Sequence, residues 1–192
     1  MNIEVSNVAN LPTTHGDFLI QSFKEGIKEH LVIFTPNYKE GFPEGKPVTV
    51  RIHSECLTGD AIGSIKCDCQ AQLNFALDYI NEHNGMVIYL RQEGRDIGLL
   101  NKVNAYNLQD KGFDTVEANH QLGFASDQRT YEVVDFIFDY YNITKVNLIT
   151  NNPAKLKGIK AQIVDRVPIE VGKTKQNENY LRVKKEKMDH LF

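Results

Sequence analysis

The stretch Pro47-Val-Thr-Val-Arg-Ile-His53 alternates between apolar and polar side chains along its length. Successive side chains of a β-strand point to opposite faces of a sheet, so this period of two predicts a strand. Val48, Val50 and Ile52 would share one face, and the polar residues between them would share the other. We therefore expect a half-buried strand that presents polar groups on one side.

The segments that follow this strand alternate between helical and extended patterns. Apolar residues at helical spacing predict helices, and short apolar runs predict strands. This order favours an α/β domain with a mixed sheet, because short strand–helix–strand units favour parallel pairing. The expected helices span 72–83, 97–111, 126–141 and 153–160, and the expected strands span 86–90, 145–149 and 163–171.

The N-terminal part of the chain is expected to extend this sheet. Residues 17–23 and 31–34 match the strand pattern and are joined by a turn near Gly26, so they would add antiparallel strands. Residues 1–14 are expected to form an irregular lead-in, and residues 177–192 a polar, helical C-terminal tail. The predicted class is α/β (α+β), with one mixed β-sheet flanked by helices.

The composition is that of an ordinary globular protein. The 192 residues are 41% hydrophobic and 24% charged, and we expect a single domain over 1–192. The 22 basic and 25 acidic residues give a net charge of −3, which argues against a nucleic-acid or membrane-surface partner. No apolar run approaches the ~20 residues that span a bilayer. With no secretory signal pattern either, we expect a cytoplasmic protein whose thiols stay reduced.

Three cysteines, Cys56, Cys67 and Cys69, lie close together in the sequence. Thiolates are soft ligands suited to Zn²⁺, and a disulfide is disfavoured in a reducing compartment. Three protein ligands with an open fourth position are typical of a catalytic zinc, whereas four are typical of a structural zinc. The spacing alone leaves both readings open, with His53 or His120 as the fourth ligand of a structural site.

Two strand-to-helix turns carry groups suited to an anion. The sequence Arg91-Gln-Glu-Gly-Arg-Asp-Ile-Gly98 places two arginines and two glycines before an expected helix. The sequence Thr150-Asn-Asn-Pro-Ala-Lys155 places a hydroxyl group and a cation in a similar position. Neither a P-loop nor a dinucleotide-binding glycine motif occurs. Taken singly, the first segment is often only a glycine-rich turn, and the second is by default a capped helix with a solvated lysine.

The motifs taken together closely resemble the GTP cyclohydrolase II family. The resemblance is carried by residues 51–60, Cys67-Asp-Cys69, 91–95, 98–102, 114–124 and 150–153, with Lys187-Met188 near the end. It implies a hydrolase, acting on cyclic amidine C–N bonds, that opens the imidazole ring of GTP. Formate and pyrophosphate would leave, giving 2,5-diamino-6-(5-phosphoribosylamino)pyrimidin-4(3H)-one at the first step of riboflavin biosynthesis. The family also implies Zn²⁺, Mg²⁺ with the GTP phosphates, a homodimer and, for this length, the stand-alone form.

The resemblance also assigns roles to individual residues. Cys56, Cys67 and Cys69 match the zinc ligands, with water in the fourth position, where zinc lowers the pKa of water to about 7. Asp127 matches a proton acceptor, Arg129 a proposed nucleophile and Tyr106 a tyrosine near the reacting ring. The positions that match substrate-binding residues are Arg51, Ile52, His53, Ser54, Glu55, Gln72, Glu93, Gly94, Arg95, Thr115, Thr150 and Lys155.

Some of these roles have alternatives. A guanidinium group stays protonated at neutral pH, so stabilising the charge of the departing pyrophosphate is an equally good role for Arg129. Asp127 and Arg129 are expected on the first turn of a helix, where residues two apart do not face each other. Glu93 and Gln72 suit the guanine base, and Arg95 and Lys155 suit phosphate oxygens. The competing functions are a non-catalytic nucleotide-binding module and a cyclohydrolase that stops at a formamide intermediate.

Overall fold

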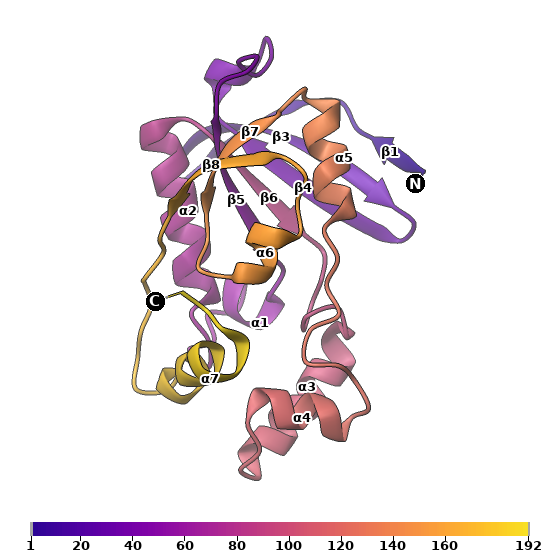
Figure 1. The fold of residues 1–192 in the computed structure, drawn as a ribbon, viewed down its shortest axis with the longest axis vertical. Coiled ribbons are helices and arrows are strands. Elements are labelled where there is room, and N and C mark those ends of the chain that lie inside the picture. Colours follow the sequence, from indigo (N-terminus) through magenta and orange to yellow (C-terminus); the bar gives the residue numbers. More distant parts are fainter. Residues whose placement is uncertain (1, 192) are drawn as a thin grey trace. The chain divides into compact units, whose positions relative to one another are not determined.

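The computed structural model of the protein describes residues 2–191 and groups them into two units (Figure 1). Each unit is assembled from separate stretches of the chain. The first unit comprises the residues up to His53, Leu73–Leu90 and Thr130–Ile169. The second comprises Ser54–Gln72, Arg91–Arg129 and the residues from Glu170 onward.

The sheet belongs to the first unit and confirms the predicted mixed α/β class. Within residues 2–191, eight strands pair in the order β1-β3-β4-β6-β5-β7-β8, with β2 paired to β3. β1 and β2 each pair antiparallel with β3, as do β3 with β4 and β4 with β6. β7 pairs parallel with both β5 and β8. The strands are β1 (Ile3–Val5), β2 (Ala9–Thr13), β3 (Gly16–Glu25), β4 (Lys28–Phe34), β5 (Val48–Ser54), β6 (Met86–Leu90), β7 (Lys145–Ile149) and β8 (Gln162–Val167).

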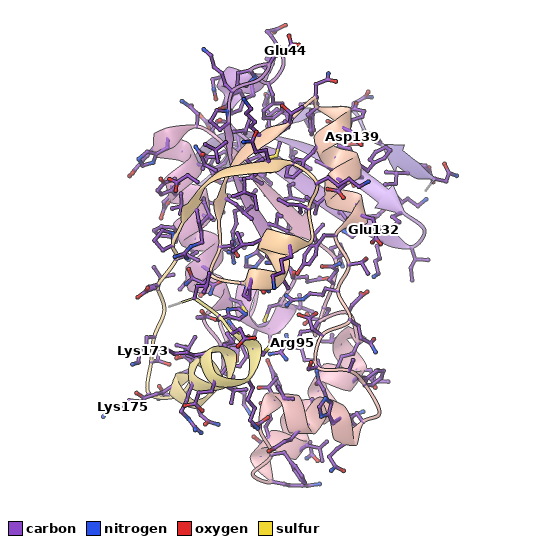
Figure 2. All side chains as sticks on the ribbon, viewed as in Figure 1. Glu44, Arg95, Glu132, Asp139, Lys173 and Lys175 are labelled. Atoms are coloured by element: carbon purple, nitrogen blue, oxygen red, sulfur yellow. The ribbon has the colours of Figure 1, made fainter. Side chains whose placement is uncertain are left out.

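Several charged side chains of the first unit lie on its outside. Glu44, in the loop before β5, and Glu132 and Asp139, on helix α5 (Glu132–Tyr140), are exposed (Figure 2). The same loop contains a short 3-10 turn, η1 (Pro36–Tyr38). Glu132 and Asp139 of α5 face solvent, and the opposite, apolar face of this helix packs on the sheet.

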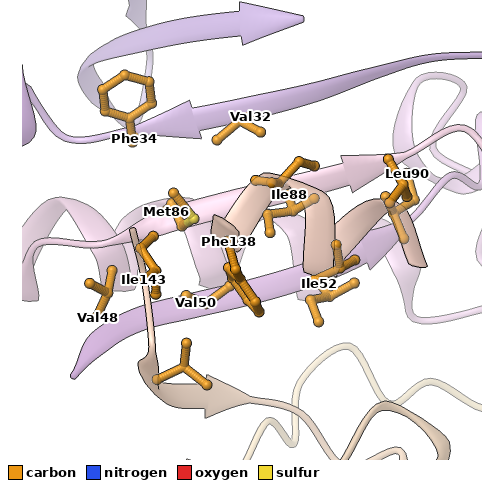
Figure 3. Close-up of a cluster of buried hydrophobic side chains, with 14 of the residues drawn as sticks. Val32, Phe34, Val48, Val50, Ile52, Met86, Ile88, Leu90, Phe138 and Ile143 are labelled. Carbon is orange, nitrogen blue, oxygen red and sulfur yellow. The ribbon is translucent and has the colours of Figure 1, made fainter. Parts of the chain in front are cut away.

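The core of the first unit forms between α5 and alternate residues of the central strands (Figure 3). Val48, Val50 and Ile52 of β5 are fully buried in this cluster, as the alternation predicts. Ile137 and Phe138 of α5 pack into the same cluster. Burial of such apolar surface contributes about 25 cal/mol per Å² to stability.

The second face of β5 is buried too, which corrects the expectation of a half-buried strand. Arg51 and His53 are only 4% and 2% exposed. Strands in the parallel part of a sheet are usually covered on both faces, so their polar residues need internal partners. Arg51 Nη1 donates to the Ile149 carbonyl at 3.0 Å, and the His53 ring stacks on Tyr89 at 5.4 Å.

The expectation of an irregular lead-in over residues 1–14 is wrong, because this segment contains β1 and β2. β3 is ten residues long. β2 pairs with its first part and β1 with its last residues, from Phe23 to Glu25. Asn10 and Pro12 are of residue types depleted in strands, so the sequence does not indicate a strand here.

Helices differ from the expected ranges in both units. The expected helix over 126–141 begins only at Glu132, with Tyr131 as its N-cap residue. α4 was not expected, and its Asp114 and Glu117 form a capping box that fixes its start. The C-terminal tail is helical as expected. The remaining helices are α1 (Leu57–Asp60), α2 (Cys69–His83), α3 (Gly98–Asp110), α4 (Thr115–Gln121), α6 (Pro153–Lys157) and α7 (Glu178–Met188).

Across residues 2–191, helices long and apolar enough to cross a membrane are absent.

Phe138→Ala is expected to destabilise the first unit, because Phe138 is 1% exposed in the core cluster. Truncation of a buried aromatic residue costs about 3–5 kcal/mol of unfolding free energy. Asp139→Ala, at an exposed position on the same helix, should change it by less than about 0.5 kcal/mol. Urea unfolding of both variants tests this, and equal midpoints would show that α5 does not anchor the sheet.

Candidate functional site

The three cysteines converge in the second unit. Cys56 is the N-cap residue of α1, Cys69 begins α2, and Cys67 lies in the loop between these helices. Their sulfur atoms all lie within 4.8 Å of one another, and the Cys56 and Cys67 sulfurs are 3.6 Å apart. In residues 2–191 this group of ligand atoms includes no histidine. His120, a candidate fourth ligand, is exposed on α4.

Gly59 lets the three sulfurs come this close. A Cβ atom at Gly59 would lie 2.9 Å from Cys67 Sγ and 3.1 Å from Cys56 Sγ. It would also lie 3.1 Å from Cys69 Cβ, so no other residue fits without displacing the thiols. A compact set of three sulfurs beside a glycine suits a thiophilic ion such as Zn²⁺, which prefers tetrahedral thiolate ligation.

The charges around the cysteines favour one thiolate even without a metal. Hydrogen bonds from Cys67 and Cys69 hold the pKa of Cys56 far below its usual range, and the Lys102 ammonium adds to this effect. The Cys67 thiol donates to that thiolate, which raises the pKa of Cys67 to about 11. The pKa of Cys69 is raised for the same reason. Binding of a divalent ion would displace the two remaining protons.

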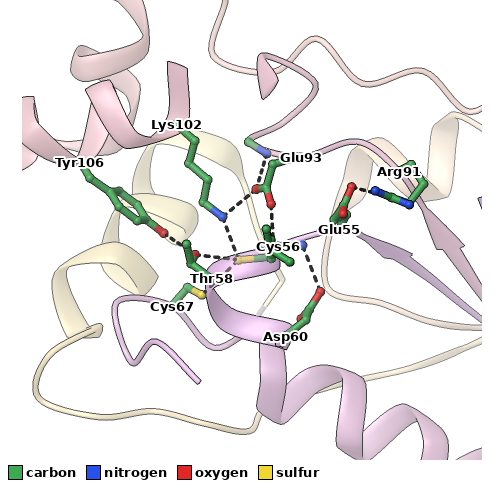
Figure 4. A network of polar contacts seen from close by, with 11 residues as sticks. Glu55, Cys56, Thr58, Asp60, Cys67, Arg91, Glu93, Lys102 and Tyr106 are labelled. Carbon is green, nitrogen blue, oxygen red and sulfur yellow. Dashed lines mark hydrogen bonds and ion pairs between the residues drawn. The ribbon is translucent and has the colours of Figure 1, made fainter. Parts of the chain in front are cut away.

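A polar network surrounds Cys56 (Figure 4). Lys102 of α3 places its Nζ atom 3.1 Å from Cys56 Sγ and 2.7 Å from Glu93 Oε1. Burial opposes the charge of Lys102, but the Glu93 carboxylate and the Cys56 thiolate raise its pKa above the usual value. Tyr106 lies one turn further along α3, and its hydroxyl group is 3.1 Å from Thr58 Oγ1.

Glu93 accepts hydrogen bonds from within the chain at both of its oxygen atoms. Oε1 accepts from Lys102 and from the Gly94 amide, and Oε2 accepts from the Leu57 amide at 2.6 Å. The carboxylate therefore joins the loop after β6 to the residue that follows Cys56. The expectation that Glu93 reads the edge of a planar base stays a prediction, because a carboxylate can accept further hydrogen bonds.

Asp127 and Arg129 face each other, which corrects the expectation that they do not. Arg129 donates through Nε to Asp127 Oδ1 at 2.8 Å and through Nη2 to Oδ2 at 2.5 Å. Their segment is not helical, so the two-residue spacing no longer separates them. Although burial opposes its charge, the pairing with Arg129 lowers the pKa of Asp127. Arg129 also donates to Ser54 Oγ at 3.3 Å.

The other predicted residues of the second unit lie in loops and at helix starts. The Arg91 guanidinium binds Glu55 at 2.9 Å, and Arg95 Nη1 donates to the Ser126 carbonyl at 3.0 Å. Gly94, Arg95 and Asp96 all have positive φ angles, a strained backbone that is typical of ligand-binding loops. Gln72 donates to Asp68, and Thr115 opens α4.

The remaining predicted residues lie in the first unit, where β5 and β7 run parallel and end at the same edge of the sheet. Lys155 is 4% exposed, and its Nζ atom donates to the Ile52 carbonyl at 2.6 Å. The buried Thr150 hydroxyl accepts from the Asn152 amide at 3.0 Å. Arg51 and His53 of β5 are buried at the same edge. The edge therefore carries two buried cations, Arg51 and Lys155, each hydrogen-bonded to a backbone carbonyl group.

Sequence reasoning missed Lys102 and the buried pair formed by Asp68 and Lys184. Lys184 of α7 donates to Asp68 Oδ1 at 2.8 Å, so the C-terminal helix holds the residue between Cys67 and Cys69. This pairing lowers the pKa of Asp68 against the opposing effect of burial. The four-residue spacing of Lys102 and Tyr106 on a predicted helix could have indicated that Lys102 lies near the site, because it places both residues on one helix face.

Comparison with known proteins places these features in a family. The family model described as GTP cyclohydrolase II matches residues 4–168. The GTP cyclohydrolase-2 of Campylobacter hominis is 62% identical over 193 residues, covering 100% of this chain and 97% of its own. That of Helicobacter pylori strain Shi470 is 54% identical, covering 99% of this chain and 98% of its own.

The chain belongs to the GTP cyclohydrolase II family. It is a hydrolase, as the resemblance of its motifs implied. The match to the GTP cyclohydrolase II model includes all three cysteines and the predicted catalytic residues. A two-domain 3,4-dihydroxy-2-butanone 4-phosphate synthase from A. baumannii is a more distant structural likeness. It has a TM-score of 0.44 and 17% identity, covering 86% of this chain and 40% of that one.

Metal-free protein is expected to keep one thiolate when the pH falls from about 7 to about 5, because the pKa of Cys56 is lowered from the ~8.5 of a free thiol. Thiolate absorbance in the ultraviolet measures this charge. Cys56→Ser should abolish the absorbance, whereas Cys67→Ser should retain part of it. Equal loss in both variants would contradict the assignment of the thiolate to Cys56.

Proposed function

We propose that this hydrolase uses a zinc ion held by Cys56, Cys67 and Cys69 to open the imidazole ring of GTP. The products would be formate, pyrophosphate and 2,5-diamino-6-(5-phosphoribosylamino)pyrimidin-4(3H)-one, at the first step of riboflavin biosynthesis. The observation that carries the proposal is the cluster of three sulfurs within 4.8 Å, without a histidine in the group. Family membership supports GTP as the substrate.

The chain supplies the ligands and the electrostatic setting for this chemistry. A zinc ion with three protein ligands would provide a Lewis acid and an activated water for attack on C8 of guanine. The Tyr106 hydroxyl, 3.1 Å from Thr58 Oγ1, is placed to orient a polar group beside the cysteines. Mg²⁺ with the phosphates and assembly as a homodimer are part of the proposal through the family resemblance.

Arg129 is proposed to stabilise charge on the departing pyrophosphate. A guanidinium group is a poor nucleophile because it stays protonated at neutral pH, and the two hydrogen bonds to Asp127 hold that of Arg129 in place. The same pairing makes Asp127 an orienting partner of Arg129 as well as a candidate proton acceptor. Arg95, Lys155 and Thr150 are each proposed, through the family resemblance, to bind phosphate oxygens. The other matched residues, among them Thr115 and Gln72, are proposed to contact the rest of GTP.

Cys67→Ser is expected to lose bound zinc and formate release together, because one of three thiolate ligands is removed. Metal analysis and formate quantification measure the two effects. Ile65→Ser introduces the same residue at an exposed position of the same loop and should retain both. Ring opening at the wild-type rate by a metal-free Cys67→Ser protein would contradict the proposal. Ring opening without formate by the wild type would favour a formamide-forming enzyme.

Arg129→Ala is expected to reduce pyrophosphate release by about 100-fold, the typical effect of removing one donor to developing charge. Pyrophosphate is measured in a coupled assay at saturating GTP. Arg182→Ala removes an exposed arginine on α7 and should leave the rate unchanged. An unchanged rate in Arg129→Ala would exclude Arg129 from the mechanism.

A further inference from the structure

We propose that Lys102 is a positioning residue of the metal centre: its ammonium group fixes the Cys56 thiolate and withdraws charge from it, so that a bound metal stays electrophilic. The inference rests on the proposed function, because it requires that the three cysteines bind a metal. It adds a residue that the motifs did not assign.

The position of Lys102 points to this role. Lysine is rarely buried unless it is paired, yet Lys102 is only 9% exposed. Its ammonium lies 3.1 Å from Cys56 Sγ and 2.7 Å from Glu93 Oε1, at the centre of the network in Figure 4. It also lies 5.7 Å from the centre of the Tyr106 ring, within range of a cation–π contact. One cation thus contacts a ligand, a carboxylate and the tyrosine proposed to orient a polar group.

The charge of the site explains why a cation is needed there. Three thiolates around a divalent ion leave a net charge of −1, and strong donation from sulfur weakens the Lewis acidity of the metal. A hydrogen bond from a cation to one sulfur draws electron density away from the metal. Groups that contact ligands in this way tune metal sites, and their loss costs about 10–100-fold in metal affinity or activity.

Glu93 limits this effect by sharing the same ammonium group. Its carboxylate also accepts from the Leu57 amide, directly after Cys56, so the pair holds the ligand in place as well as balancing charge. Removing Lys102 should therefore strengthen donation from Cys56. Removing the charge of Glu93 should weaken donation, because the ammonium then acts on the sulfur alone.

Cobalt-substituted protein without GTP tests these opposite effects. In Lys102→Met the thiolate-to-cobalt charge-transfer band should move to longer wavelength, and in Glu93→Gln it should move to shorter wavelength. Lys102→Arg should restore most of the wild-type band. Lys111→Met, which removes an exposed lysine just after α3, should leave the band unchanged. With zinc bound, Lys102→Met should lower kcat by about 10-fold or more, with a smaller change in KM.

The double variant Glu93→Gln/Lys102→Met guards against misfolding, because it removes both members of the buried Lys102–Glu93 ion pair together. Its band should also lie at longer wavelength than that of Glu93→Gln. If the band stays at the wild-type position in Lys102→Met and in the double variant, the proposed role of Lys102 is overturned, but the proposed metal centre is not. A wild-type protein that binds no cobalt would overturn the metal centre, and this inference with it.

Discussion

The close approach of three sulfur atoms around Gly59 is the constraint on which the second unit depends. Hydrogen bonds among thiols this close lower the pKa of Cys56 and raise that of Cys67, which favours one thiolate in the group. A buried thiolate needs a nearby cation, and Lys102 provides it. The cation in turn needs Glu93, whose second oxygen atom returns to the residue after Cys56. These contacts form a closed network that begins and ends at Cys56 and the residue after it.

The first unit also contains buried cations, and these donate hydrogen bonds to backbone carbonyl groups. Its parallel strands β5 and β7 end at one edge of the sheet, where Arg51 and Lys155 are buried. Arg51 donates to the carbonyl oxygen of Ile149, and Lys155 donates to that of Ile52, so backbone acceptors hold both cations near the strand ends. Cations at this edge fit the proposal that Lys155 binds a polyanionic substrate.

The sequence predicts the parts of the structure that depend on short-range patterns. The strand predicted from the alternation in 47–53 and the helix predicted over 72–83 are confirmed, and the three cysteines that lie close in sequence also lie close in space. Ser126 and Asp127 resemble helix caps, but the helix begins five or six residues later at Glu132, so the pairing of Asp127 with Arg129 was not foreseen. Lys102 meets Cys56 across 46 residues, a contact that only the folded chain reveals.

X-ray absorption spectroscopy of the zinc-loaded protein tests the central claim, a three-cysteine metal centre with an open position, most directly. The account predicts three sulfur ligands at roughly 2.3 Å and one light-atom ligand without the outer-shell scattering of an imidazole ring. An imidazole signal, a fourth sulfur or fewer than three sulfurs would contradict it.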